Sequence, residues 1–175
     1  MKISQLRRSR AFTLVELIVV MVLLGIIGAL AAGPTLNYVR TIRTRGAAGR
    51  IAADLRYAQR WAMSTRNQTW VAFNVAGNAY QLYVENPANP GRLGRIALAG
   101  PLDNATGSIA IGDPPFSGVA LSTVGVNATS EVQFDSLGMP HDANGVALPT
   151  DGAIGLNDGV TVYVRRVSGL AEVSE

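Results

Sequence analysis

The chain has 175 residues, of which 48% are hydrophobic and 15% charged, and its formal net charge is +3. This length suits one ordinary domain with an additional segment. The chain contains no cysteine and one histidine, which excludes disulfides, thiolate catalysis and zinc sites built from cysteines or several histidines.

The charged residues are segregated along the chain. Residues 1–11 carry four basic side chains and no acid, residues 40–66 carry seven arginines against Asp54, and the residues after Arg66 carry four arginines against ten carboxylates. The pattern divides the chain into a basic leader, an apolar block, a basic helix and an acidic head. Such asymmetry bears on partners and solubility rather than on fold.

The apolar block predicts a membrane-spanning helix. Residues 17–39 contain no charged side chain, and their length of 23 residues exceeds the roughly 20 that a helix needs to cross a bilayer core. The alternative is a buried helix of a soluble domain. A chain of this size has little interior in which to hide a helix that is apolar on every face, so the membrane interpretation is favoured.

Two kinds of leader fit the segment before this block. A secretory signal peptide would use the basic residues 1–11 and a cleavage site at residues 29–31, after the apolar run. A prepilin leader is cut before the run. Glu16 separates the two, because a signal peptide has no use for a carboxylate there. A charge inside a spanning segment costs roughly 2.5–3.5 kcal/mol and is by default a functional candidate.

Residues 10–17, with the sequence RAFTLVEL, resemble the class III signal of type IV pilins and pseudopilins. The resemblance implies that a prepilin peptidase cuts between Ala11 and Phe12, that the new N-terminal Phe12 is N-methylated, and that Glu16 becomes the fifth residue of the mature chain. Position 11 is Ala where the family usually has Gly. Ala is the smallest alternative, so we expect processing there, at a slower rate.

The position of Glu16 suggests a role in filament assembly. A carboxylate in lipid is unfavourable without a cation, and cleavage creates the α-amine of Phe12 four residues upstream. In the membrane this amine would pair with Glu16 of its own chain. In a filament it would pair with Glu16 of a neighbour, which would set the axial register of packing.

Pro34 follows three glycines of the apolar block, and it predicts a kink because proline removes a helix hydrogen bond. The pattern is similar to the curved N-terminal helix of pilins. The glycines at 25, 28 and 33 also suit close helix packing in a membrane. In a filament core, the same glycines would serve both the curvature of the helix and its close packing.

Residues 40–67 predict an amphipathic stalk helix. Four apolar residues recur on one helical face, namely Ile51, Leu55, Ala58 and Ala62. We expect Asp54 to lie on the exposed surface with a weak ion pair to Arg50, four residues before it. The arginines at 40, 43 and 45 lie just past the predicted span, which favours a solvated or lipid-headgroup face over nucleic acid.

Three further segments resemble the GspH/FimT family of minor pilins: residues 55–63 followed by 69–73, residues 132–138, and residues 168–170. The resemblance implies that the end of the long helix packs on the head and leads directly into its first strand. We expect Trp61 and Met63 to belong to the core.

From residue 69 onward the apolar residues alternate with a period of two, which predicts an antiparallel, sandwich-like β head. Gly77 and Asn78 predict a hairpin turn between the first two strands. The predicted strands are residues 70–75, 80–84, 95–98, 108–111, 119–124, 131–134, 153–156 and 160–167. The fold class is therefore α+β and pilin-like.

The head contains no recognisable catalytic motif, which predicts a protein that is not an enzyme and holds no cofactor. His141 falls in a turn-rich loop, and the loop carboxylates and amides match no calcium motif, so Asx turns explain them better than a metal. Some FimT-like minor pilins take up DNA through a basic C-terminal tail. Here residues 168–175 are acidic, which argues against nucleic-acid binding.

The sequence therefore predicts a leader peptide at 1–11, a transmembrane and filament-core helix at 12–39, a stalk helix at 40–67 and a periplasmic head at 68–175. The function predicted is that of a minor pseudopilin of type II secretion, anchored in the bacterial inner membrane by a single pass. The alternative is a minor pilin of a type IV pilus in adhesion, motility or DNA uptake. The expected partners are other pilins or pseudopilins, the prepilin peptidase and methyltransferase, an inner-membrane assembly platform and exoprotein cargo.

Overall fold

The computed structural model describes residues 13–102 and 106–174, without the side chains of residues 30–37. The chain divides into two units, Met1–Val39 and Arg40–Glu175, and each is described by itself. Helix α1 (Leu14–Thr65) contributes residues to both units. The division into leader, membrane helix, stalk and head stays a prediction.

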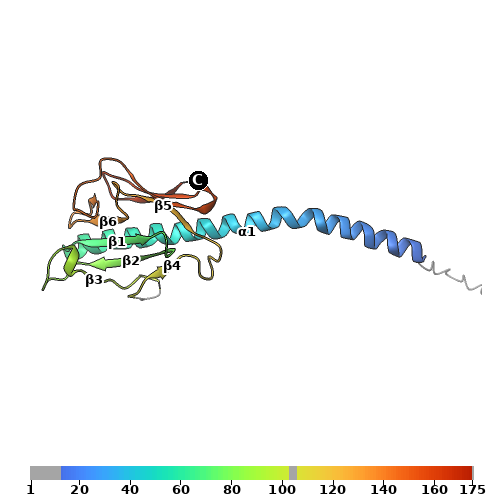
Figure 1. Cartoon of the computed structure of the whole chain (residues 1–175), viewed down its shortest axis with the longest axis horizontal. Coiled ribbons are helices and arrows are strands. Elements are labelled where there is room, and N and C mark those ends of the chain that lie inside the picture. The colour runs from blue at the N-terminus through green and yellow to red at the C-terminus, as the bar shows by residue number, and fades with distance from the viewer. Residues whose placement is uncertain (1–12, 103–105, 175) are drawn as a thin grey trace, which may run out of the picture. The chain divides into compact units, whose positions relative to one another are not determined.

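The second unit holds two antiparallel sheets (Figure 1). The first has the strand order β3-β2-β1-β6-β7, with β4 beside β2, and the second has the order β10-β9-β8-β5. The first sheet is formed by β1 (Thr69–Asn74), β2 (Ala79–Val84), β3 (Ile96–Ala97), β4 (Ile109–Ala110), β6 (Glu131–Phe134) and β7 (Pro140–His141). The second is formed by β5 (Leu121–Gly125), β8 (Gly152–Leu156), β9 (Thr161–Val164) and β10 (Ala171–Ser174). Two short 3₁₀ helices complete the unit, η1 (Arg92–Gly94) and η2 (Asn157–Gly159). The predicted α+β class is confirmed.

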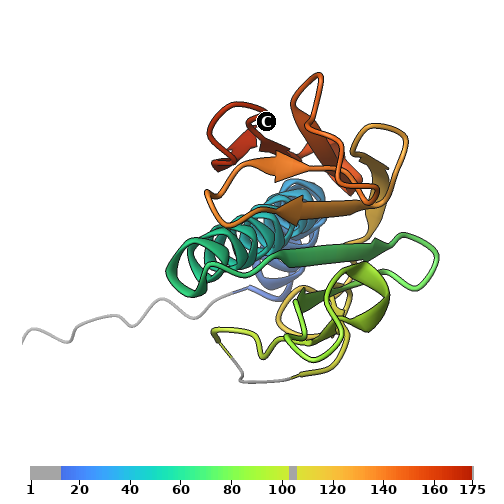
Figure 2. The same cartoon turned by 90° about the vertical axis from the view of Figure 1, so that its left-hand side faces the viewer.

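One hydrophobic core joins both sheets to the C-terminal part of α1, around which the strands are arranged (Figure 2). The helical face predicted from the sequence is buried, with Ile51 at 1% exposure and Leu55, Ala58 and Ala62 at 0%. In β1, Val71 and Phe73 join this core, whereas Trp70 does not, although it is only 1% exposed. Because alternate residues of a strand point to opposite faces, Trp70 is buried on the face of the sheet away from α1.

The predicted hairpin is confirmed. Strands β1 and β2 pair over their full lengths, and Asn78 adopts a φ of 48° in the turn between them. The side-chain carbonyl of Asn78 accepts the N–H of Leu121 at 2.8 Å, and its amide donates to the carbonyl of Val119 at 2.9 Å. The turn of the first sheet therefore also fixes the start of β5 in the second.

Three expectations about the second unit are wrong, and one strand was not predicted. Asp54 is 1% exposed rather than on the surface, and Met63 is 43% exposed rather than in the core, while Trp61 is half-buried against the core. His141 lies in strand β7, not in a loop, because it pairs with Gln133. The strand that was not predicted is β10, in which Ala171–Ser174 pair with β9 at the edge of the second sheet.

Two glycine turns meet beside α1. The side-chain amide of Gln59 donates to the carbonyls of Gly138 at 2.9 Å and Ser168 at 2.6 Å. Gly169 has a φ of +66°, and a Cβ atom there would lie 2.5 Å from the carbonyl oxygen of Gly138. Both segments were singled out by the resemblance in the head, and Gln59 holds them together.

We expect Gly169→Ala to destabilise the protein by roughly 1–3 kcal/mol, because it adds a backbone collision to an unfavourable φ. Gly118→Ala is the matched control, since Gly118 has a φ of +87° and open space around its Cβ position. Urea unfolding of both variants measures the difference. Equal losses of stability would show that the contact between the two turns contributes nothing.

Candidate functional site

The predicted processing and assembly residues lie at the N-terminus. Ala11 and Phe12 are outside the described residues. Glu16 is exposed in the first turn of α1, and Pro34 falls within α1 in the stretch whose side chains are not described. The cleavage site, the methylation of Phe12, the assembly role of Glu16 and the kink at Pro34 all stay predictions.

Thr13 positions Glu16 by capping the helix. Its hydroxyl oxygen accepts the N–H of Glu16 at 3.3 Å, and its backbone carbonyl accepts the N–H of Leu17 at 3.2 Å. Thr13 thus occupies the N-cap position and Glu16 the third helical position, which is the Thr-x-x-Glu spacing of a capping box. The negative charge of Glu16 also lies where the partial positive charge at the start of a helix stabilises it.

The capping role of Thr13 was missed by the sequence analysis, although the spacing was visible. A Thr followed three residues later by Glu, just before an apolar run, is a known signature of a helix start. The favourable position of its charge at the helix start gives Glu16 a structural role that is independent of assembly. The two roles are compatible, because the cap uses the backbone N–H of Glu16 and leaves its carboxylate exposed.

The apolar residues of the first unit are uncovered. Side chains from Leu14, at 76% exposure, to Ile27, at 61%, are exposed at every successive position. Because successive residues of a helix point in all directions around its axis, no face of this segment is buried within a single chain. An apolar surface of this extent is typical of a segment that is covered by lipid or by other chains.

The predicted span, residues 17–39, includes the stretch 30–37 whose side chains are not described. Across the described ranges 13–102 and 106–174, the structure has no helix that is both long and apolar enough to span a membrane.

The N-terminal segment matches a known family model. Residues 6–32 match the prokaryotic N-terminal methylation motif. The N-terminal segment is thus similar to the N-termini of pilin-like proteins. The motif contains a class III prepilin leader, which implies processing by a prepilin peptidase, anchoring in a membrane and assembly with other pilins into a filament. Such proteins are typically structural subunits rather than enzymes. No curated protein and no solved structure matches the chain.

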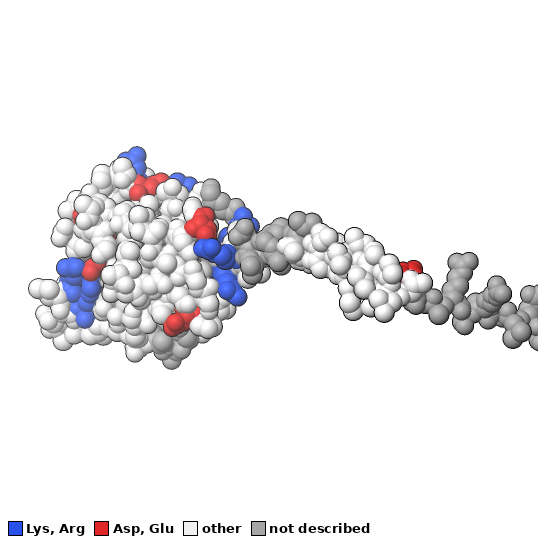
Figure 3. Space-filling view, turned by 45° about the vertical axis from the view of Figure 1, so that its right-hand side comes forward, with Lys and Arg blue, Asp and Glu red and all other residues white. Residues whose placement is uncertain are grey.

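The start of the second unit carries the predicted basic group. The second unit includes α1 from Arg40 onward. Figure 3 shows Lys and Arg side chains beside acidic ones at the end of the unit where this part of α1 begins. Arg40 forms an ion pair with Asp158 at 3.5 Å, and the hydroxyl of Thr44 donates to the same carboxylate at 3.0 Å. The guanidinium of Arg43 donates to the carbonyl of Ser117 at 3.4 Å. These arginines therefore also tie the helix to loops of the head.

A buried carboxylate lies between α1 and the first sheet. The hydroxyl of Tyr80 donates a short hydrogen bond to Asp54, and Arg50 forms an ion pair with the same carboxylate at 3.9 Å. Burial and the neighbouring Asp54 carboxylate both raise the pKa of Tyr80 above its ordinary value. The Arg50–Asp54 pair was predicted from its spacing, but its burial was not, because an i, i+4 pair alone does not reveal which face it lies on.

A second carboxylate cluster lies on the opposite face of the first sheet. Glu131 is 8% exposed and receives hydrogen bonds of 2.9 and 2.7 Å from Arg92 and of 2.7 and 3.2 Å from Arg95. The Arg95 guanidinium also lies 4.1 Å from the centre of the Tyr83 ring. Burial opposes ionisation of Glu131, but the bonds from both arginines outweigh it and lower its pKa to about 2.

The loop carboxylates near the C-terminus hold turns and strands in place. Asp142 is buried and accepts the N–H groups of Asn144 at 2.8 Å and Val146 at 3.0 Å, as in an Asx turn. Burial raises its pKa, and these bonds reverse the effect, so the net pKa is lowered. No group of three or more His, Asp or Glu side chains able to hold a metal is found in the described part of the chain.

Arg165 is engaged within the head. Its guanidinium forms ion pairs with Asp151 at 2.9 Å and Glu172 at 2.7 Å, which connects the segment before β8 to the edge strand β10. One of the two arginines that precede the C-terminal strand is thus already paired with carboxylates, which weakens its use as a contact for nucleic-acid phosphates.

We expect Tyr80→Phe to destabilise the protein by roughly 1–3 kcal/mol, because it leaves the buried Asp54 carboxylate without its hydroxyl donor. The matched control is Tyr163→Phe, since the hydroxyl of Tyr163 makes no hydrogen bond with any described residue. The loss of stability of this variant should be near zero. Thermal unfolding of the two variants in parallel tests this. The interpretation fails if both variants melt like the parent protein.

Stability should fall as the pH drops from about 4.5 to about 2, the ordinary and folded pKa values of Glu131. The folded pKa is the lower of the two, so the stabilisation is complete above the unfolded pKa and is lost as pH falls through the folded one. Glu131→Gln should be less stable at neutral pH and should lose less on acidification in this window. Unfolding at a series of pH values measures this difference, with Glu172→Gln as the control, because the side chain of Glu172 is 42% exposed. A parallel pH profile for Glu131→Gln and the parent would contradict the prediction.

Proposed function

We propose that this chain is a minor pseudopilin of a type II secretion system, of the GspH/FimT kind, which supports assembly of the pseudopilus and export of proteins. The observation that carries the proposal is the methylation motif at residues 6–32 on a helix whose apolar side chains are exposed all around. A subunit of this design has its own core in the head and leaves its N-terminal helix to be covered by neighbours.

The head supports the narrower assignment to the GspH/FimT kind. Helix α1 ends at Thr65 and β1 begins at Thr69, so the helix leads directly into the first strand. The hydroxyl of Thr69 donates to the carbonyl of Ala58 at 3.0 Å, which anchors this transition. The segments at 137–138 and 168–170 meet through Gln59, as expected if they form a common structural element of such heads.

The proposed mechanism begins with cleavage between Ala11 and Phe12. The reaction frees the α-amine of Phe12, which is four residues before Glu16 in the sequence. Thr13, already the helix cap, stays between them in the mature chain. In the filament the amine of one subunit pairs with Glu16 of the next, and a pair of opposite charges in an apolar core tolerates only one axial register.

Mass spectrometry of the membrane-extracted protein tests the processing step. We expect a mature chain that begins with N-methylated Phe12, and we expect Ala11→Gly to be processed faster than the parent in a pulse-chase experiment. A chain that still begins at Met1, or one cut at residues 29–31, would overturn the assignment.

We expect Glu16→Ala to insert into the membrane at the parent level but to be absent from filaments. Loss of one member of a buried ion pair costs roughly 3–5 kcal/mol, which corresponds to a fall in incorporation of roughly 100-fold or more. Glu16→Asp, which retains the charge, is the matched variant. Quantitative blotting of sheared filaments against the membrane fraction gives the ratio, and equal incorporation of Glu16→Ala and the parent would remove the proposed role.

Deletion of the gene separates the two filament systems. For a secretion pseudopilin we expect loss of exoenzyme export, which returns on complementation with the parent chain. Intact export with lost surface motility or adhesion would instead assign the chain to a type IV pilus.

A further inference from the structure

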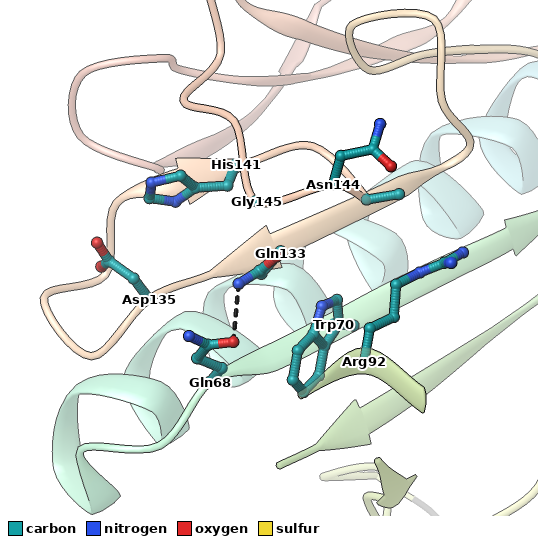
Figure 4. Close-up of a pocket in the computed structure, with 9 residues that line it drawn as sticks. Gln68, Trp70, Arg92, Gln133, Asp135, His141, Asn144 and Gly145 are labelled. Atoms are coloured by element: carbon teal, nitrogen blue, oxygen red, sulfur yellow. Dashed lines mark hydrogen bonds between the residues drawn. The ribbon is translucent and has the colours of Figure 1, made fainter. Parts of the chain in front are cut away.

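The outer face of the first sheet holds a hollow of about 330 Å³ (Figure 4). Three neighbouring strands supply its floor, because Trp70 of β1 pairs with Gln133 of β6, and Gln133 pairs with His141 of β7. Directly opposed residues of antiparallel strands point to the same face. Gln68 enters from the turn before β1 and Asn144 from the loop after β7.

The indole nitrogen of Trp70 lacks a partner in this hollow. Trp70 is 1% exposed, and its Nε1–H has no acceptor among the described residues. In Figure 4 the nitrogen-bearing edge of the ring is turned toward Gln133. A buried donor without an acceptor is unfavourable, and such a group calls for a partner that the folded chain does not itself provide.

The charged side chains around the hollow balance in number, because Arg92 and Arg95 are matched by Glu131 and Asp135. The guanidinium of Arg92 is bound to Glu131, and one carboxylate oxygen of Asp135 accepts the N–H groups of Leu137 at 2.9 Å and Met139 at 2.8 Å. The surroundings of the hollow as a whole therefore offer a charged ligand no net opposite charge. An apolar ligand would meet amides and an imidazole instead of the hydrophobic walls that such ligands prefer.

The remaining hydrogen-bonding capacity belongs to side chains that both donate and accept. Gln133 donates to Gln68 at 3.0 Å, and the amide of Asn144 is exposed at the rim. Amides and an indole N–H suit an uncharged ligand that is rich in hydroxyl groups. The volume lies at the lower end of the range for small-molecule sites, roughly 300–1,000 Å³, which suits one or two sugar rings.

We propose that this hollow binds a neutral saccharide, whose oxygen accepts the hydrogen bond of Trp70 Nε1–H. Access to the covered nitrogen follows rotation of Gln133, and Asn144 bonds the ligand at the rim. The proposal concerns residues of the second unit only, so its test does not depend on the proposed role in secretion.

The indole N–H signals in a nitrogen–proton NMR spectrum provide a direct test. The chain has two tryptophans, Trp61 and Trp70, and Trp61→Phe assigns the two signals. The full chain is studied in a detergent without sugar headgroups, because a glycosidic detergent would itself occupy the site. The probes are maltose, N-acetylated chitobiose as an uncharged amino-sugar disaccharide, and sodium acetate as an anion.

We expect a saturable shift of the Trp70 signal with at least one disaccharide, while the Trp61 signal stays in place. A shift with chitobiose alone indicates an amino-sugar glycan such as that of a cell wall, and a shift with maltose alone indicates a hexose glycan; both support the proposal. No saturable shift with either sugar, or a shift with acetate alone, overturns it.

Asn144→Ala should weaken sugar binding by roughly tenfold, as expected for one lost hydrogen bond to the ligand. Asn89→Ala is the matched control, because Asn89 is an exposed amide outside the hollow. Equal effects of the two variants on the titration would remove the assigned site.

Discussion

The packing of one face of α1 against both sheets holds the second unit together. Alanines make up much of this face, and those at 47, 48, 52, 58 and 62 are all nearly or fully buried. Small side chains let a helix approach a sheet closely, and the larger residues then come from the strands, such as Tyr80 and Phe134. Every other feature of the head, including the hairpin, the glycine turns and the outer hollow, depends on the sheets being held in this way.

The same close packing explains where the head buries charge. Asp54 belongs to the buried part of α1, so its carboxylate is taken out of water and must be compensated by Arg50 and Tyr80. Such an arrangement gives little net stability over an apolar pair, but it penalises any shift of the helix along the sheet. On the opposite face of the first sheet, the charge of the buried Glu131 carboxylate is likewise compensated, by ion pairs with Arg92 and Arg95.

The N-terminal part of α1 has the reverse composition and no cover of its own. Large aliphatic side chains point outward at successive positions after Thr13, where the C-terminal part has alanines on one face and arginines on others. A helix of the first kind is completed by lipid or by copies of itself, and a helix of the second kind by its own head. This difference along α1 suits the proposed subunit, which would pass from a membrane into a filament.

The sequence by itself determined the elements whose signals are local. The leader was predicted from the resemblance of residues 10–17 to the class III signal. The buried face of α1 followed from its helical period, and the first hairpin from alternation around Gly77 and Asn78. Each signal lies within a few residues and needs no knowledge of what packs against it.

Only the tertiary structure decided the features that depend on distant partners. The burial of Asp54 depends on Tyr80, the meeting of two glycine turns depends on Gln59, and β10 exists because β9 offers it an edge. The outer hollow joins residues from three strands and two loops, so its chemistry could not be assembled from spacing along the chain. Local patterns report what a segment prefers, whereas the partner of a buried polar group is set by which segments the fold brings side by side.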